Sequence, residues 1–366
     1  MSFEKIKGNF GFGCMRLKMN EDKVDYQEFE RMIDAFIEAG FNYFDTAHGY
    51  IDGKSEIAIG ECLSSRYKRE DFILANKLSD WYFESEEEIV PLFESQLKSC
   101  KVDYFDFYLF HAVGRGNYEK HKKCNSFEVV KKLKEQGKIK HIALSFHDTA
   151  DVLDRILSEQ PSIEAVQLQI NYLDFDDPGI QSKACYDVAV KHGNKVIVME
   201  PVRGGALVNL PKGAAKLFDE LGGGSYASYA LRYAGSYPEV FMVLSGMGSM
   251  EMMEDNISTF SPFIPLKEEE IKATDKAREI IREARLIPCT KCRYCTEVCE
   301  KNIPIPEIFE CYNEHLSAKI TRSEAKAKFP NDKGQITDCV MCGKCEKICP
   351  QNIEIKEKLK EIAKEN

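Results

Sequence analysis

Short β-rich segments alternate with longer amphipathic segments from Phe10 to about Ile257, and this alternation constrains the fold more than any other feature of the chain. Strands that are separated by helical segments form βα units, whose strands lie parallel in one sheet. The eight strand candidates are residues 10–15, 42–46, 72–78, 105–111, 139–146, 165–170, 195–201 and 240–246. Eight βα units in about 250 residues match a (β/α)8 barrel.

The helical segments between these strands have clear ends. Residues 26–39 and 127–136 are amphipathic and stop at Gly40 and Gly137, where a glycine is typical. A doubly wound sheet is the alternative, but residues 11–16 lack the third glycine of the dinucleotide-binding fingerprint. We therefore predict an α/β fold built on a (β/α)8 TIM barrel.

Cysteines near the end of the chain repeat one spacing twice. Nine of the 14 cysteines follow residue 288, and eight of them form two C-x2-C-x2-C-x3-C runs, the second followed by Pro350. This spacing is the bacterial ligand run for [4Fe-4S] clusters, in which the fourth cysteine usually ligates the other cluster. The predicted ligand sets are Cys289, Cys292, Cys295 and Cys349 for one cluster and Cys339, Cys342, Cys345 and Cys299 for the second.

Zinc is the alternative for these cysteines, because C-x2-C pairs also bind zinc. Two runs of four closely spaced cysteines supply more thiolates than two paired zinc sites need. Residues 267–285 read as a charged amphipathic helix, and Pro288 opens the cysteine-rich region. We predict a boundary near residue 286, with the barrel in residues 1–285 and a small, mainly helical dicluster ferredoxin-like domain in residues 286–366.

Composition excludes several classes of protein. The formal net charge of -10 argues against a nucleic-acid partner, which would require clustered lysine and arginine. The first ten residues lack a signal-peptide apolar segment, and no uncharged stretch approaches the roughly 18 residues of a membrane span. We expect a soluble, cytoplasmic protein, and a reducing compartment favours metal binding over disulfides.

Four ionisable residues stand at or just beyond the ends of predicted strands, where barrel active sites assemble. They are Asp45, Tyr50, Lys77 and His111. Each alone has an ordinary explanation, such as a helix cap, an ion pair or a core histidine. Charges on apolar strands are costly unless they are paired, so four such residues at one end of the barrel indicate a site.

With these residues the chain resembles the aldo/keto reductase superfamily, whose tetrad is Asp, Tyr, Lys and His from the same barrel positions. The resemblance covers about residues 8–260 and includes the segments 40–50 and 230–233. With the cysteine-rich region and the segment 200–205 it is similar to the iron-sulfur branch. It implies that Tyr50 is the acid-base residue, because a nearby Lys77 cation would lower its pKa from near 10. Asp45 would hold Lys77, and His111 would bind the substrate carbonyl.

The resemblance also implies NAD(P)H across the barrel mouth. The candidate cofactor-binding residues are Ser145, Gln169, Arg203, Gly204, Gly205, Gly246, Ser249 and Asn256. Phe146 replaces an expected asparagine, Glu200 stands where a stacking ring is common, and residues 246–252 lack a cation for a 2′-phosphate. NAD, NADP and a flavin therefore remain open as alternatives.

Electron counting bears on this choice, because hydride transfer moves two electrons and a cluster passes one. A flavin such as FMN can convert between them, with its phosphate near Arg203, Gly204, Gly205 and Ser249, the usual phosphate corner of such barrels. We predict an oxidoreductase that interconverts a small carbonyl compound and its alcohol, with the clusters relaying electrons. The alternatives are a flavin-bridged, ferredoxin-linked electron-transfer or redox-sensing protein, and ordinary NAD(P)H chemistry beside purely structural clusters.

Overall fold

The structure is a computed structural model that describes residues 3, 5–284, 286–317 and 319–364. The chain divides into two compact units, one formed by Met1–Pro201 with Ala227–Leu266 and one by Val202–Tyr226 with Lys267–Asn366. The boundary near residue 286 stays a prediction. The division adds that residues 202–226, which follow a strand of the first unit, pack with the cysteine-bearing region.

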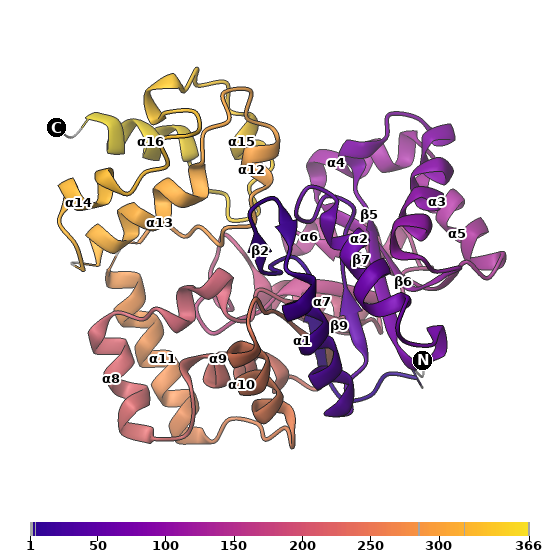
Figure 1. Cartoon of the computed structure of the whole chain (residues 1–366), viewed down its shortest axis with the longest axis horizontal. Helices are drawn as coiled ribbons and strands as arrows, with labels where there is room; N and C mark the ends of the chain where they lie inside the picture. Colours follow the sequence, from indigo (N-terminus) through magenta and orange to yellow (C-terminus); the bar gives the residue numbers. More distant parts are fainter. Residues whose placement is uncertain (1–2, 4, 285, 318, 365–366) are drawn as a thin grey trace. The chain divides into compact units, whose positions relative to one another are not determined.

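The first unit contains a closed barrel of eight parallel strands in the order β1-β10-β9-β8-β7-β6-β5-β4 (Figure 1). This confirms the (β/α)8 prediction, and all eight predicted strands are present. Their bounds are β1 Phe10–Gly13, β4 Tyr43–Asp45, β5 Ile73–Leu78, β6 Phe105–Val113, β7 Ile139–Phe146, β8 Ala165–Gln169, β9 Lys195–Met199 and β10 Val240–Gly246. Several are shorter than predicted; β9, for example, ends before Pro201, which has no N–H to donate to a neighbouring strand.

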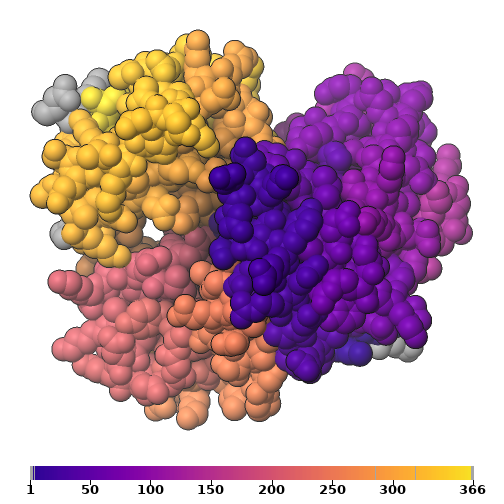
Figure 2. Space-filling view, in the orientation of Figure 1, coloured from indigo at the N-terminus to yellow at the C-terminus, as the bar shows by residue number. Residues whose placement is uncertain are grey.

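Helices connect the strands, and a short hairpin of β2 (Met19–Asn20) and β3 (Lys23–Val24) follows β1. In Figure 2 the indigo surface belongs to the N-terminal segment of the chain, which includes this hairpin and α1. Asp25 caps α1 by accepting a hydrogen bond from the Glu28 N–H at 3.1 Å. The helices of this unit are α1 Tyr26–Glu38, α2 Lys54–Ile59, α3 Ile89–Cys100, α4 Arg115–Lys123, α5 Ser126–Glu135, α6 Ala150–Glu159, α7 Ser182–Lys191, α9 Tyr226–Gly235, whose first residue belongs to the second unit, and α10 Met250–Phe260.

Apolar side chains fill the barrel interior. The buried cluster contains Tyr43, Ile73, Ala75, Phe107, Leu109, Ala143, Ala165, Ile197, Met242 and Leu244. Polar side chains take over toward the carboxyl ends of the strands, since Asp45 is the last residue of β4 and Lys77 is the next to last of β5. The packed interior thus supports a polar layer at the end of the barrel where active sites form.

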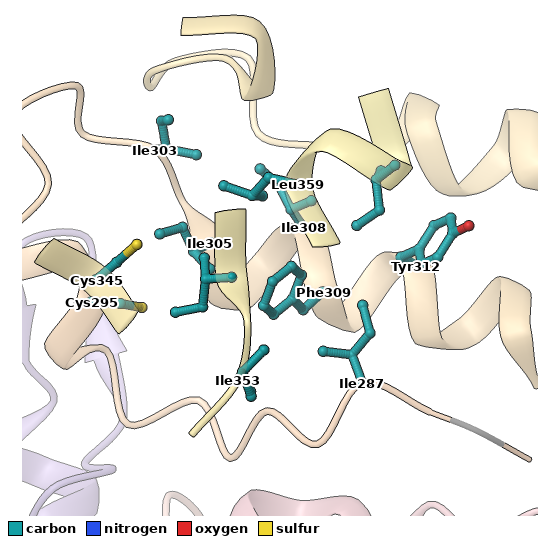
Figure 3. Packing of buried hydrophobic residues seen from close by; sticks show 12 residues of the cluster. Ile287, Cys295, Ile303, Ile305, Ile308, Phe309, Tyr312, Cys345, Ile353 and Leu359 are labelled. Carbon is teal, nitrogen blue, oxygen red and sulfur yellow. The ribbon is translucent and has the colours of Figure 1, made fainter. Parts of the chain in front are cut away.

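The second unit is helical, as the sequence predicts for residues 286–366. Its helices are α8 Lys212–Leu221, α11 Glu268–Glu283, α12 Tyr294–Glu297, α13 Ile305–Leu316, α14 Arg322–Ala327, α15 Lys344–Lys347 and α16 Ile355–Lys364. Isoleucines from both cysteine regions, with Phe309 and Leu359, form its core (Figure 3). Among the described residues of the whole chain, no helix has the length and hydropathy needed to span a bilayer.

The two cysteine runs fold as copies of each other. Lys291 and Met341 occupy equivalent positions with φ of 59° and 58°, and Asn302 and Asn352 both have φ of 50°. Each run contains one short helix, α12 or α15, and leads into a longer one, α13 or α16. Cys295 and Cys345, from α12 and α15, lie side by side at one end of the isoleucine core (Figure 3). The sequence repeat is therefore also a structural repeat.

Candidate active site and cluster sites

An ion pair between Asp45 and Lys77 forms the base of the candidate active site. The Lys77 Nζ donates to Asp45 Oδ1 at 2.5 Å and to the carbonyl oxygen of Thr46 at 2.8 Å, and both side chains are buried. Burial raises the pKa of Asp45 and lowers the pKa of Lys77, while the attraction between the two charges opposes both shifts. The contact between the two side chains is thus the main interaction that favours their charged forms.

Tyr50 lies in the loop after β4 and is nearly buried. The Lys77 Nζ is 4.6 Å from the centre of its ring. The ring of Tyr50 also packs edge-on against the imidazole of His111, and the two ring centroids are 5.9 Å apart. The structure therefore brings together all four residues that the sequence analysis placed at the barrel mouth.

His111 is on β6 and is only 2% exposed. Burial is the main cause that lowers the pKa of His111 well below its usual value, and the Lys77 cation and His147 act in the same direction. Its Nδ1 is 2.6 Å from the hydroxyl oxygen of Ser79, and the Trp81 ring lies 5.1 Å away. The lowered pKa makes the imidazole neutral at neutral pH. Ser79 and Trp81 both contact it.

A buried polar network lies behind the strand that carries Lys77. Glu56 Oε1 accepts from Asn76 Nδ2 at 2.9 Å and from Gln96 Nε2 at 3.2 Å. Gln96 also donates to the Lys77 carbonyl oxygen at 3.0 Å, and the Tyr108 hydroxyl donates to Gln96 Oε1 at 2.6 Å. Satisfied buried networks of this kind rigidify their surroundings, so this one holds the backbone of Lys77 in place.

The candidate cofactor residues of the barrel have defined partners. Gln169, at the end of β8, donates from Nε2 to Asp174 Oδ2 at 2.6 Å, which fixes the orientation of its amide. Asn256 donates to the Ser245 hydroxyl at 2.9 Å, and Ser249 caps α10. Ser145 is buried on β7, and Gly246 ends β10. An oriented amide and a buried hydroxyl are groups that fit a carboxamide such as that of nicotinamide.

Arg203, Gly204 and Gly205 belong to the second unit, together with the cysteines. Gly204 has φ of 62°, and a Cβ there would lie 2.1 Å from the carbonyl oxygen of Thr290, between Cys289 and Cys292. Gly205 has φ of 92° and open space around it. Close packing against the first cysteine run is therefore a reason for a glycine at position 204 that does not involve a phosphate.

The predicted crossed ligand set shares one cavity. Cys289, Cys292, Cys295 and Cys349 line it, and apolar side chains from the isoleucine core complete it. Four thiolates in an apolar setting suit a [4Fe-4S] cluster.

The sequence analysis did not identify Ser79, Glu56, Gln96 or Asp174. Ser79 could have been predicted as a site residue, because it is a polar residue directly after the predicted strand 72–78 and two residues after Lys77. Glu56, Gln96 and Asp174 lie in helices or loops, and only the fold brings them to the site. No short sequence pattern marks them.

Comparison with known proteins agrees with the fold. Residues 9–279 match the model of the aldo/keto reductase family, and residues 288–354 match that of a 4Fe-4S dicluster domain. The first match covers most of the chain, so the chain belongs to the aldo/keto reductase family. It is an aldo/keto reductase-type oxidoreductase that also carries a C-terminal 4Fe-4S dicluster domain.

Individual relatives resemble the barrel part. An uncharacterised oxidoreductase of Bacillus subtilis, YqkF, is 26% identical over 297 residues, which are 72% of this chain and 90% of the relative. Methylglyoxal reductase of Escherichia coli is 32% identical over 134 residues, 37% of this chain and 44% of the relative.

Solved structures give the same result for the fold. An aldo-keto reductase from Bacillus halodurans in its holo form has a TM-score of 0.61 at 25% identity, covering 74% of this chain and 91% of that one. An aldo-keto reductase from Klebsiella pneumoniae in complex with NADPH has a TM-score of 0.61 at 19% identity, covering 73% and 90%. At that identity the second likeness shows the fold alone.

Proposed function

We propose that this protein interconverts a small carbonyl compound and its alcohol at Tyr50. The observation that carries the proposal is the placement of Tyr50 between the Lys77 cation, 4.6 Å from its ring centre, and the neutral imidazole of His111. A phenol is a usable proton donor at neutral pH only where a nearby cation stabilises its phenolate.

Each residue has a separate task in this reaction. NAD(P)H, when bound, would supply the hydride. His111 hydrogen-bonds the carbonyl oxygen and orients it, and Tyr50 delivers a proton to that oxygen. Asp45 keeps Lys77 charged and in place through their 2.5 Å contact. Ser145 and Gln169 would hold the carboxamide of the nicotinamide.

The cofactor proposal draws on relatives as well as on these residues. The Klebsiella pneumoniae structure is described as a complex with NADPH, and the Escherichia coli relative is named a methylglyoxal reductase. A small aldehyde such as methylglyoxal is thus a rational first assay substrate, with NADPH and NADH compared as reductants.

Substitution of Tyr50 tests the proposal. In anaerobically purified protein, Tyr50→Phe should lower kcat/KM for aldehyde reduction by at least about 100-fold, because it removes the positioned proton donor. Iron content and the visible spectrum should not change. Tyr67→Phe is the matched control, since the Tyr67 hydroxyl bonds Asp34 outside the site. Loss of aldehyde reduction is the expected result, whereas unchanged electron flux through the protein in Tyr50→Phe would instead favour an electron-transfer or redox-sensing role for the barrel.

We also propose that the two clusters relay single electrons to or from this site, with ferredoxin or another one-electron carrier as partner. The support is that one chain carries both the aldo/keto reductase barrel and a 4Fe-4S dicluster domain. A relay needs a group that exchanges two electrons for one, and a flavin is the candidate. Denaturation of anaerobically purified protein should then release a flavin, and its absence would exclude this role.

A further inference from the structure

The Ser79 side chain is buried beneath the imidazole of His111. Ser79 follows β5 directly and is 0% exposed. Its hydroxyl oxygen is 2.6 Å from His111 Nδ1, and within the part of the chain that the structure describes this is its only hydrogen-bond partner. The contact therefore decides where the hydroxyl hydrogen points.

Two arrangements of the hydrogens are compatible with this distance. If Nδ1 carried the proton and donated it, the buried Ser79 hydroxyl hydrogen would have no acceptor, at a cost of about 1–3 kcal/mol. If Ser79 donates to an unprotonated Nδ1, both groups are satisfied. The second arrangement is preferred, and in a neutral imidazole it places the single ring proton on Nε2.

We propose that Ser79 is a positioning residue that holds neutral His111 in the Nε2–H tautomer, so that the ring donates a hydrogen bond to the substrate carbonyl oxygen. The proposal rests on the carbonyl-binding role of His111 under Proposed function. The rings of Trp81, at 5.1 Å, and Tyr50, at 5.9 Å, confine the imidazole from its sides. Ser79 therefore determines which nitrogen carries the proton, and the aromatic neighbours determine how the ring lies.

This assignment has a consequence for what the site binds. A ring that donates from Nε2 favours an oxygen that accepts, such as a ketone or aldehyde oxygen. It leaves the proton exchanged with that oxygen to Tyr50, because the neutral His111 has no second proton to give. Loss of the Ser79 hydroxyl would allow the Nδ1–H tautomer, in which Nε2 accepts and repels a carbonyl oxygen.

The test measures the tautomer and the rate separately. In the full-length protein labelled with 15N-histidine, the His111 signals, assigned with His111→Gln, should show a protonated Nε2 and an unprotonated Nδ1. In Ser79→Ala the Nδ1–H form should appear, and kcat for aldehyde reduction should fall about 10- to 100-fold with the KM for the nucleotide unchanged. Ser79→Thr, which keeps a hydroxyl, should restore both. Ser126→Ala removes another buried serine hydroxyl and should alter neither.

The outcomes are distinguishable from those of the functional proposal. An unchanged Nε2–H tautomer in Ser79→Ala would overturn the role of Ser79, whatever the activity. A shifted tautomer with full activity would overturn the link between the tautomer and catalysis, and so the carbonyl-binding role of His111. Loss of both in Ser79→Ala, with recovery in Ser79→Thr, supports the inference.

Discussion

At the residue scale, the site depends on charges and hydrogen bonds buried among apolar strands. The Asp45–Lys77 pair is nearly inaccessible to solvent. Breaking a buried pair by removing one partner is strongly destabilising, whereas removing both charges can be nearly neutral. The role of the pair in stability can therefore be separated from its proposed role in catalysis.

Lys77→Met should destabilise the protein by about 3–5 kcal/mol, because it leaves the Asp45 carboxylate buried without its cation. The double variant Asp45→Asn with Lys77→Met should regain most of this stability but no aldehyde reduction. Urea unfolding followed by circular dichroism, beside an activity assay, measures both effects. A single variant as stable as the wild type would contradict the description of a charged, buried pair.

His121 gives a prediction about pH. It is fully buried in α4, burial lowers its pKa to about 3, and neither ring nitrogen has a hydrogen-bond partner among the described residues. Its unfolded pKa is near 6.5. Between these values the unfolded chain binds a proton that the folded chain does not, so stability falls as the pH falls. This residue alone should contribute a loss of about 1.4 kcal/mol between pH 7.5 and pH 5.5.

In His121→Leu this part of the pH dependence should disappear, and stability at pH 7.5 should not decrease. Unfolding free energies at the two pH values measure the difference. His192→Gln is the comparison, since His192 is partly exposed and pairs with Asp154. An equal pH slope in wild type and His121→Leu would show that folding does not lower the pKa of His121.

At the element scale, the eight βα units could be predicted because hydrophobic periodicity and glycine stops act locally. The packing of residues 202–226 with the cysteine-bearing region could not, because it joins segments about 80 residues apart in the chain. The same holds for the site. Four site residues could be proposed from their places at or just beyond predicted strand ends, namely Asp45, Tyr50, Lys77 and His111. Gln96 could not, because it reaches Asn76 and Lys77 only through the packing of α3 on β5.

Gly204 tests the packing of these elements. Gly204→Ala should displace the loop around Thr290, because its Cβ would meet that carbonyl oxygen at 2.1 Å. We expect loss of up to four of eight iron atoms per chain. Gly205→Ala also has a positive φ but meets nothing within 4 Å, so it should keep its iron and lose only about 1–2 kcal/mol of stability. Equal iron content in the two variants would show that the contact does not support a cluster.

At the scale of the whole molecule, the predicted crossed ligand sets would link the two ends of the dicluster region. Cys289 and Cys349 line one cavity although 60 residues separate them in the chain. Ligands of one cluster should act as a unit when substituted. Cys289→Ala, Cys349→Ala and their combination should each lose the same four irons.

Combining Cys289→Ala with Cys339→Ala should instead remove all eight irons. Iron and sulfide analysis after anaerobic purification measures these losses. Complete iron loss in the Cys289 and Cys349 double variant, with half lost in each single variant, would show that the ligands are not crossed.

In the proposed relay, the electrons for carbonyl reduction at Tyr50 pass from the two clusters to the hydride-donating cofactor and from there to the substrate. The most direct test is a single-turnover electron count. Anaerobic protein with both clusters reduced, and with the nucleotide or flavin that purifies with it, is mixed with excess aldehyde. Two one-electron clusters should oxidise as two protons are taken up and one alcohol forms per chain, and Tyr50→Phe should form none. Clusters that stay reduced while added NAD(P)H still reduces the aldehyde would contradict the proposed relay of electrons from the clusters.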